Sequence, residues 1–209
     1  MSEGTTPRNP WDERYGQEPY AYGEAPNVYL KEQLAKLAPG TILFPADGEG
    51  RNGVHAATQG WTVHSFDLST EGRKKALKLA GQYGVEIDYR VGELSTLGYR
   101  PHQFDAVGLI YAHFPPALRQ GLHRQINALL KPGGTVILEA FSKNHLPYRA
   151  QNPAVGGPPD LDTLFSLEEV QRDFPGFEVE ELVEKEVELH EGLYHNGTGL
   201  VVRFTGRKQ

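Results

Sequence analysis

The stretch ILFPADGEGRNG, residues 42–53, joins a short apolar run to a glycine-rich turn. Gly48, Gly50 and Gly53 have the G-x-G-x-x-G spacing that lets a backbone approach a nucleotide-like ligand closely. Asp47 and Glu49 lie within the same turn. A dinucleotide would place its diphosphate here, and two like charges ~4 Å apart repel by ~4 kcal/mol at an effective dielectric constant of about 20. The turn is therefore expected to bind a ligand without phosphate.

Strands and helices alternate along the chain from this stretch onward. Apolar, β-branched or aromatic runs predict strands, and apolar residues at helical spacing predict helices. The predicted strands are 41–45, 61–66, 85–91, 104–111 and 135–141, and the predicted helices are 27–38, 51–59, 70–83, 116–130 and 166–174. This order favours an α/β fold with a doubly wound, Rossmann-like sheet that is mostly parallel and is covered by helices on both faces.

The alternation of strands and helices stops near the end of the chain. Residues 177–189 and 199–205 both have strand patterns, and the Asn196-Gly197 pair between them is typical of a hairpin turn. Two strands this close in sequence cannot be joined by a helical crossover. The sheet is therefore predicted to end with an antiparallel hairpin.

The length of 209 residues fits one domain, which we expect to span 1–209. Residues 1–26 are rich in Pro, Gly, Tyr and charged residues, which predicts an irregular N-terminal arm. Residues 144–164 form a stretch without strong periodicity that is long for a compact domain, so we expect a lid-like loop.

Composition excludes several classes of function. The chain has no cysteine, which excludes disulfides, thiolate metal sites and cysteine nucleophiles. Its net charge of -6 and lack of basic patches argue against nucleic acid as a partner. No secretory leader and no apolar run near the ~18 residues of a membrane span are present, so we expect a cytoplasmic protein that does not bind membranes. Oligomeric state is not predicted by any pattern.

S-adenosyl-L-methionine fits an acidic glycine-rich turn, because it carries a sulfonium and an ammonium and no phosphate. Asp67 ends the second predicted strand, where its carboxylate can accept hydrogen bonds from ribose hydroxyls, although it could instead cap the helix that follows Ser69. Gly92, Glu93 and Leu94 follow the third strand, where an adenine could bind. The three loops belong to the same edge of the predicted sheet, and this coincidence favours an adenosine ligand.

Three stretches of the sequence resemble class I S-adenosylmethionine-dependent methyltransferases, in particular the small bacterial type related to tellurite-resistance and thiopurine methyltransferases. They are LFPADGEGRNGVHAATQGWTVHSFDLS, FDAVGLIYAHFP and LLKPGGTVILEAF, and WDERYG, YGEAPN and HEGLYHNGTG extend the likeness to both ends. The resemblance implies a seven-stranded sheet with a reversed last strand and S-adenosyl-L-methionine as the cofactor. The cofactor-binding residues that it and the loops indicate are Tyr22, Pro45, Asp47, Gly48, Gly50, Arg51, Asn52, Asp67, Leu68, Ser69, Gly92, Glu93, Leu94, Tyr111 and Ala112.

Two positions depart from the family pattern. Phe44 stands where many members have an acidic residue, and Ala46 replaces the first glycine of the turn. Asp47 is then the acidic group nearest to the cofactor's ammonium. Tyr15, Tyr20 and Tyr22 in the arm could attract a sulfonium through their rings or could simply hold the arm on the core, and Tyr22 is the one we expect to bind cofactor.

Methyl transfer from a sulfonium needs alignment and exclusion of water, and a base only for hydroxyl or amine acceptors. His113 follows the fourth strand and is the candidate base, with a packed structural histidine as the alternative. Glu139 and Phe141 end the fifth strand, where an acceptor could bind, although Glu139 could equally belong to a structural network. His190 and His195 are predicted to line the substrate mouth, and no metal is expected.

We therefore expect a methyltransferase that acts on a small molecule. A nicotinamide-dependent oxidoreductase is one alternative, and a cofactor-binding module without turnover is another. The sequence does not name the methyl acceptor.

Overall fold

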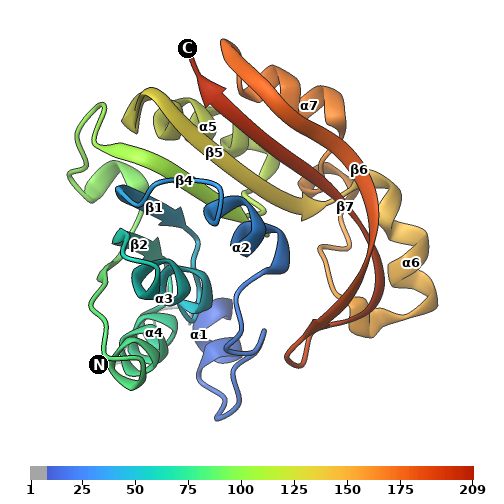
Figure 1. Ribbon diagram of the computed structural model, residues 1–209. Coiled ribbons are helices and arrows are strands. Elements are labelled where there is room, and N and C mark those ends of the chain that lie inside the picture. The colour runs from blue at the N-terminus through green and yellow to red at the C-terminus, as the bar shows by residue number, and fades with distance from the viewer. Residues whose placement is uncertain (1–8) are drawn as a thin grey trace, which may run out of the picture.

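The computed structural model describes residues 9–209 and contains one seven-stranded sheet with the order β3-β2-β1-β4-β5-β7-β6. All neighbouring strands pair in parallel except that β7 is antiparallel to both β5 and β6. The strands are β1 Thr41–Pro45, β2 Thr62–Asp67, β3 Asp88–Val91, β4 Phe104–Ile110, β5 Leu130–Phe141, β6 Phe177–Glu191 and β7 His195–Lys208. The predicted α/β class, the seven strands and the antiparallel end are confirmed (Figure 1).

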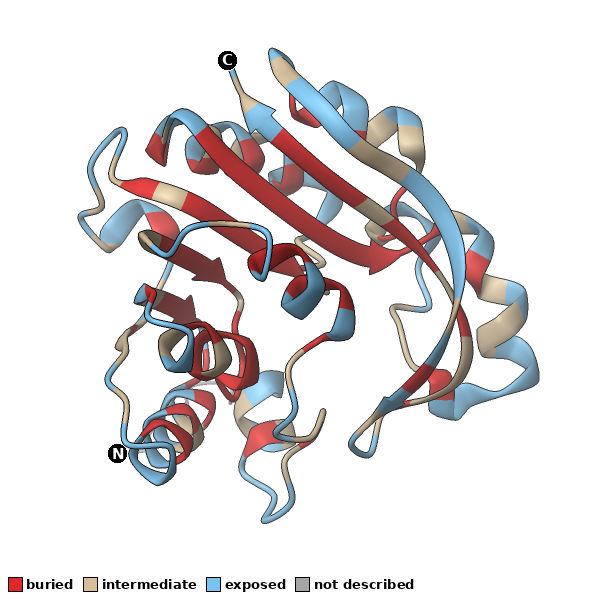
Figure 2. Ribbon diagram, viewed as in Figure 1, coloured by how far each residue is buried: buried red, intermediate tan, exposed pale blue. Residues whose placement is uncertain are grey.

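Helices cover the sheet on both faces. They are α1 Pro10–Tyr15, α2 Val28–Leu34, α3 Arg51–Thr58, α4 Thr70–Gln82, α5 Pro116–Leu129, α6 Leu146–Gln151 and α7 Leu167–Asp173, with 3₁₀ helices at Leu94–Thr96, Lys143–His145, Pro153–Val155 and Leu161–Thr163. Apolar residues of α2 and α3 pack on one face of the central strands, and those of α5 and α7 pack on the other. The central strands are buried on both sides, whereas the edge strand β6 is largely exposed (Figure 2).

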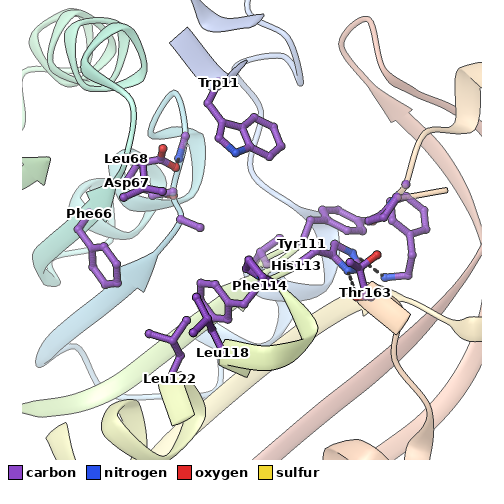
Figure 3. Close-up of a pocket in the computed structure, with 18 of the residues that line it drawn as sticks. Trp11, Phe66, Asp67, Leu68, Tyr111, His113, Phe114, Leu118, Leu122 and Thr163 are labelled. Carbon is purple, nitrogen blue, oxygen red and sulfur yellow. Dashed lines mark hydrogen bonds between the residues drawn. The ribbon is translucent and has the colours of Figure 1, made fainter. Parts of the chain in front are cut away.

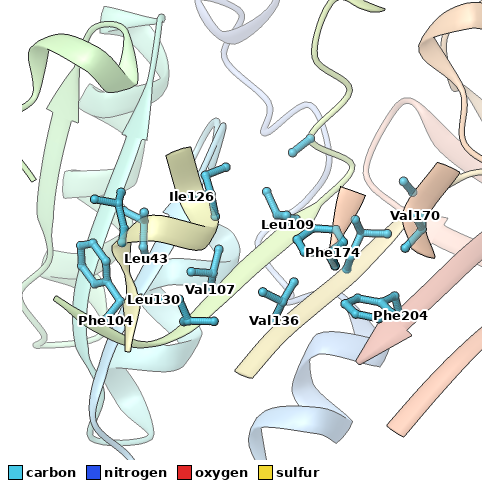
Figure 4. Packing of buried hydrophobic residues seen from close by; sticks show 14 of the residues in the cluster. Leu43, Phe104, Val107, Leu109, Ile126, Leu130, Val136, Val170, Phe174 and Phe204 are labelled. Atoms are coloured by element: carbon cyan, nitrogen blue, oxygen red, sulfur yellow. The ribbon is translucent and has the colours of Figure 1, made fainter. Parts of the chain in front are cut away.

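The larger core cluster lies under α5 and α7. Leu43, Val107 and Val136 come from three adjacent strands and pack in one cluster with Ile126 of α5 and with Phe174, which directly follows α7 (Figure 4). These residues are buried almost completely, and each apolar side chain removed from water stabilises the fold by roughly 1.5–3 kcal/mol. The carboxyl ends of the strands, beyond this core, are left free for loops.

The hairpin turn lies three residues earlier than predicted, so the prediction of a turn at Asn196-Gly197 is wrong. Asn196 pairs with His190 and Gly197 with Leu189 inside the β6–β7 ladder, and the chain turns at residues 192–194. Gly192 has φ of +63°, which a glycine adopts without steric cost. A Cβ at Gly192 would also lie 2.3 Å from the backbone nitrogen of Gly23, so this glycine lets the arm approach the hairpin.

Two irregular predictions are replaced by short helices. The N-terminal arm contains α1, which begins at the N-cap Asn9 with Pro10 in its first turn. Residues 144–164 contain α6 and two 3₁₀ helices rather than an open loop. A lid function for that segment stays a prediction. Within residues 9–209, no helix combines the length and the apolar character that a bilayer crossing requires.

Gly50 is expected to be needed for packing of the glycine-rich turn on α4. It has φ of +82°, and a Cβ there would lie 2.4 Å from the Cβ of Ala76. Gly50→Ala should therefore lower the free energy of unfolding by about 2–5 kcal/mol, through steric overlap and the left-handed backbone together. Urea denaturation measures this loss.

Gly84→Ala is the matched control, because Gly84 has φ of +65° and open space around its Cα. It should lose only the backbone part, about 1–2 kcal/mol. Equal losses in the free energy of unfolding of the two variants would show that overlap with Ala76 does not contribute to the destabilisation.

Candidate active site

A cavity of about 1110 Å³ opens at the carboxyl ends of β1, β2 and β4. The strand order reverses between β1 and β4, and such a switch point is where open α/β sheets bind ligands. Its walls come from the loops after these strands, from the N-terminal arm, from residues 153–159 and from the hairpin tip. Ligand pockets commonly measure ~300–1,000 Å³, so the volume of this cavity lies just above that range.

One end of the cavity is built around Asp67. Its Oδ2 accepts a hydrogen bond from the backbone N–H of Gly48 at 3.0 Å, and its Oδ1 accepts one from Ser69 at 2.9 Å. Burial raises the pKa of this carboxyl, although the two backbone N–H groups act in the opposite direction. Leu68, Gly92, Glu93 and Leu94 line the same end. Figure 3 shows Asp67 and Leu68 across the cavity from Tyr111 and His113.

The two carboxylates within the turn, those of Glu49 and Asp47, both contact other parts of the protein. Glu49 accepts a hydrogen bond from the backbone N–H of Ala21 at 2.7 Å and forms an ion pair with Lys75 at 2.7 Å. Asp47 directs Oδ2 to the hydroxyl of Ser65 at 2.7 Å, on the side of α3 and β2. The turn is therefore less free to attract a cation than its sequence indicates.

The N-terminal arm forms a wall of the cavity. Trp11, Arg14 and Tyr15 of α1 line it together with Tyr22, and the guanidinium of Arg14 donates to the hydroxyl of Tyr22 at 2.7 Å. Tyr20 does not line the cavity, because it packs on α4 and donates to the carbonyl of Lys75. Of the three arm tyrosines, Tyr15 and Tyr22 are therefore placed to meet a ligand.

Arg51 and Asn52 begin α3 and hold the arm. Arg51 donates to the carbonyl oxygens of Tyr22 and Ala25 and forms an ion pair with Glu191 at 2.9 Å. Asn52 accepts a hydrogen bond from the backbone N–H of Asn27 at 3.0 Å. Both residues also line the cavity, and the guanidinium of Arg51 and the side-chain oxygen of Asn52 are already paired.

Glu139 belongs to a buried network below the cavity and does not line it. Its Oε1 accepts from the side-chain amide of Asn27 at 2.6 Å and from the hydroxyl of Tyr111 at 3.0 Å. Its Oε2 accepts from Arg203 at 2.6 Å. These contacts favour the structural interpretation of Glu139. Phe141, which ends the same strand, does line the cavity and stacks on Tyr111 with ring centroids 4.9 Å apart.

His113 lines the cavity but both of its ring nitrogens are occupied. Nδ1 lies 3.0 Å from the carbonyl oxygen of Thr163, and Nε2 accepts from the backbone N–H of Phe141 at 3.3 Å. Burial lowers the pKa of His113 to about 4. A neutral ring with Nδ1–H satisfies both contacts and leaves no free lone pair, so the geometry favours the packing alternative over a base.

The two hairpin histidines lie on opposite faces of the hairpin, His190 in β6 and His195 in β7. His195 is buried and lines the cavity, with its ring 4.5 Å from that of Tyr111 and 4.5 Å from that of Tyr22. His190 is exposed and lies outside the cavity, because side chains alternate along β6 and its neighbour Leu189 takes the buried side. The structure therefore does not support a substrate contact for His190.

Most of the predicted residues meet at the cavity. Those that line it are Tyr22, Asp47, Gly48, Arg51, Asn52, Asp67, Leu68, Gly92, Glu93, Leu94, Tyr111, His113, Phe141 and His195. Those that do not are Pro45, Gly50, Ser69, Ala112, Glu139 and His190. Lining residues that the sequence did not indicate include Trp11, Arg14, Phe66, Phe114, Leu118, Gly156 and Tyr194. The helix start at Asn9-Pro10 is the signal that could have found Trp11 and Arg14.

Comparison with known proteins identifies residues 42–134 as a match to the methyltransferase domain family. A ubiquinone biosynthesis O-methyltransferase of Xanthomonas euvesicatoria pv. vesicatoria is 30% identical over 137 residues, which is 64% of this chain and 56% of that protein. An uncharacterized protein of Mycobacterium tuberculosis is 31% identical over 107 residues, 49% of this chain and 38% of that protein. The chain thus spans about two fifths to somewhat over half of the length of these relatives.

Solved structures share the fold at low identity. One of them is described as "Conversion of a Disulfide Bond into a Thioacetal Group during Echinomycin Biosynthesis". It superposes on this chain with a TM-score of 0.75 at 18% identity, over 95% of this chain and 91% of that one. TehB from Haemophilus influenzae gives 0.71 at 14% identity, over 95% of this chain and 66% of that one. Residues 42–134 thus match a methyltransferase domain, and the chain shares the fold of the class I S-adenosylmethionine-dependent methyltransferases, the family that its sequence resembles.

Proposed function

We propose that this protein is an S-adenosylmethionine-dependent methyltransferase that acts on a small-molecule acceptor. The observation that carries the proposal is the position of Asp67, a buried carboxylate that faces a cavity at the switch point of a methyltransferase fold. Each of its oxygens accepts one backbone hydrogen bond and keeps acceptor capacity for a ribose hydroxyl.

The residues around the cavity fit S-adenosyl-L-methionine. Asp67 would hold the ribose, Glu93 and Leu94 would border the adenine, and Gly48 would let the backbone approach the methionine portion. Arg14 has no carboxylate partner among residues 9–209 and would pair with the carboxylate of the cofactor. Rings of Tyr15 and Tyr22 would face its cationic groups, a contact worth about 0.5–2 kcal/mol. When bound, the cofactor supplies an electrophilic methyl group for in-line displacement.

The charge distribution supports this ligand over a dinucleotide. Arg51, the cation nearest to the start of α3, is already paired with Glu191 and is not free for a diphosphate. Glu49 is neutralised by Lys75. The remaining carboxylates, Asp47 in the turn and Asp67 at the end of β2, would both repel a phosphate when ionised.

A small-molecule acceptor is favoured because several segments of the protein enclose the cavity. The arm with Tyr22, the hairpin tip with Tyr194 and the segment containing Gly156 all contribute to its walls. The relative from Xanthomonas is named as an O-methyltransferase, which favours an oxygen acceptor.

Binding of S-adenosylhomocysteine tests the proposal directly. The wild-type protein should bind it in a calorimetric titration, and Asp67→Ala should weaken binding about 10- to 150-fold, the worth of charged hydrogen bonds of about 1.5–3 kcal/mol. Asp105→Ala is the matched control, because Asp105 also accepts a backbone N–H, from Thr41, but does not line the cavity. Equal affinity in Asp67→Ala and wild type would show that the ribose lies elsewhere, and NADH binding in place of S-adenosylhomocysteine would support the oxidoreductase alternative.

The buried carboxyl of Asp47 is expected to lower the free energy of unfolding as pH rises. Burial raises the pKa of its carboxyl from 3.8 to about 7, and its Oδ1 has no hydrogen-bond partner among residues 9–209. The folded state therefore holds a proton between pH 4 and 7 that the unfolded state releases. Asp47→Asn should become more stable relative to wild type across this window, by at most about 1.4 kcal/mol per pH unit, in urea denaturation at a series of pH values.

Asp88→Asn is the control, because its stability relative to wild type should change with pH in the opposite direction. Hydrogen bonds from Arg90 lower the pKa of the Asp88 carboxyl, so its contribution to stability is present above the unfolded pKa and is lost as pH falls. The stability of Asp88→Asn relative to wild type should decrease as pH rises toward the ordinary carboxyl pKa of 3.8 and should level off above it. A flat difference for Asp47→Asn would mean that its carboxylate is solvated or paired in the folded protein.

A further inference from the structure

His195 is held at one ring nitrogen by a carboxylate. Its Nδ1 lies 2.8 Å from Oε2 of Glu191, and the same oxygen is 2.9 Å from the guanidinium of Arg51. The two residues face each other across the hairpin, as the last pair of β6 and β7. Because a carboxylate can only accept, Nδ1 carries the hydrogen, and the lone pair of the neutral ring lies on Nε2.

Nε2 of His195 is left available beside the cavity. Within residues 9–209 it has no hydrogen-bond partner, although the residue itself is 95% buried. Gly156 is the neighbour on that side, and a Cβ there would lie 2.7 Å from Cδ2 and 3.3 Å from Nε2. The lack of a side chain at Gly156 therefore leaves space next to this nitrogen.

The neighbouring histidines cannot offer a lone pair in the same way. His113 uses both nitrogens on the carbonyl of Thr163 and the N–H of Phe141. His145 uses both on the carbonyl of Gly156 and the N–H of Leu200. Of these three rings, His195 alone has an unpaired nitrogen among the described contacts.

The place of His195 is close to the switch point. Tyr111 directly follows β4, and its ring lies 4.5 Å from the ring of His195. Phe141 ends β5 with its ring 5.2 Å from that of His195, and Tyr22 of the arm lies 4.5 Å away. Aromatic walls of this kind suit a flat aromatic ligand, because rings attract one another when they stack or meet edge to face.

Burial keeps the ring of His195 neutral, whereas the two nearby carboxylates favour its protonated form. Burial lowers its pKa, and Arg51 acts in the same direction, while Glu191 and Glu139 raise it. His113 and His145 are also near, and the hydroxyls of Tyr22 and Tyr111 belong to the two rings that contact it. The pKa of Glu191 is lowered to about 2 by its contacts with His195 and Arg51, which outweigh its burial, so Glu191 stays ionised beside a newly formed imidazolium.

We propose that Nε2 of His195 accepts the proton from the hydroxyl group of a flat aromatic methyl acceptor, with Glu191 as the positioning residue. This inference rests on the proposed function. The hydroxyl oxygen forms the new bond to the methyl carbon, and the carbon–sulfur bond breaks with its electron pair remaining on sulfur. The hydroxyl proton passes to Nε2 and later leaves to water.

Protonation of His195 can be observed without turnover. The protein labelled with ¹⁵N-histidine is saturated with S-adenosylhomocysteine, and 4-nitrophenol is added as the probe hydroxyl. One histidine should change to the imidazolium signature in the ¹⁵N spectrum. The change should be absent in His195→Gln and retained in His190→Gln, a control on the exposed side of the same hairpin.

Each outcome of this titration decides something. Failure of the wild-type protein to bind S-adenosylhomocysteine refutes the proposed function and the role of His195 with it. Binding of that ligand without binding of 4-nitrophenol refutes the aromatic hydroxyl class alone. Binding of both with every histidine neutral, or an imidazolium that persists in His195→Gln, refutes the role of His195.

A matched acceptor pair separates proton transfer from packing. With phenol as acceptor, His195→Gln should lose about 10²–10⁴-fold in kcat, whereas with thiophenol, which ionises without help, the loss should stay within about threefold. Glu191→Gln should lose activity with both acceptors, because it also breaks the ion pair with Arg51, and should lose more with phenol than with thiophenol. Equal losses on the two acceptors would show that His195 only supports the wall of the cavity.

Discussion

The ion pair between Arg51 and Glu191 is the contact on which the architecture of the site depends. Its side chains are only 8% and 10% exposed, and it joins the first turn of α3 to the tip of the C-terminal hairpin. Arg51 also binds two carbonyl oxygens of the N-terminal arm, and Glu191 also holds the ring of His195. Three segments far apart in sequence therefore converge on two side chains. Loss of either partner would leave a buried charge, a change that typically costs about 3–5 kcal/mol, and would release the arm and the hairpin together.

This arrangement encloses a cavity whose two ends differ in chemical character. The end beside Asp67 presents a buried carboxylate, held by two backbone N–H groups, and small residues, which suits a nucleoside. The end beside His195 presents rings and one unpaired nitrogen, which suits an aromatic acceptor. Tyr111 lies between the two ends, and its hydroxyl is tied to Glu139 below the floor. The buried Glu139 network thus fixes the floor rather than taking part in binding.

The fold could be predicted from sequence because it rests on local patterns, whereas much of the site rests on contacts between distant residues. Apolar runs such as 104–110 marked the buried strands, and Pro and Gly marked their ends. The hairpin turn was misplaced because Asn196-Gly197 has turn propensity but Gly192 meets the close approach of Gly23. His113 was placed correctly beside the cavity, yet its role could not be read, because its partner Thr163 lies fifty residues away. Likewise the sequence does not show that Glu49 is paired, because its partner Lys75 lies 26 residues further along the chain.

The central claim is that the switch-point cavity holds an adenosyl ligand with its ribose on Asp67 and its sulfur toward Tyr111 and His195. A crystal structure of the complex with S-adenosylhomocysteine tests this most directly. The account predicts both ribose hydroxyls within hydrogen-bond distance of the Asp67 carboxylate and the sulfur facing the aromatic end of the cavity. A ribose away from Asp67, or a sulfur directed away from Tyr111 and His195, would contradict it.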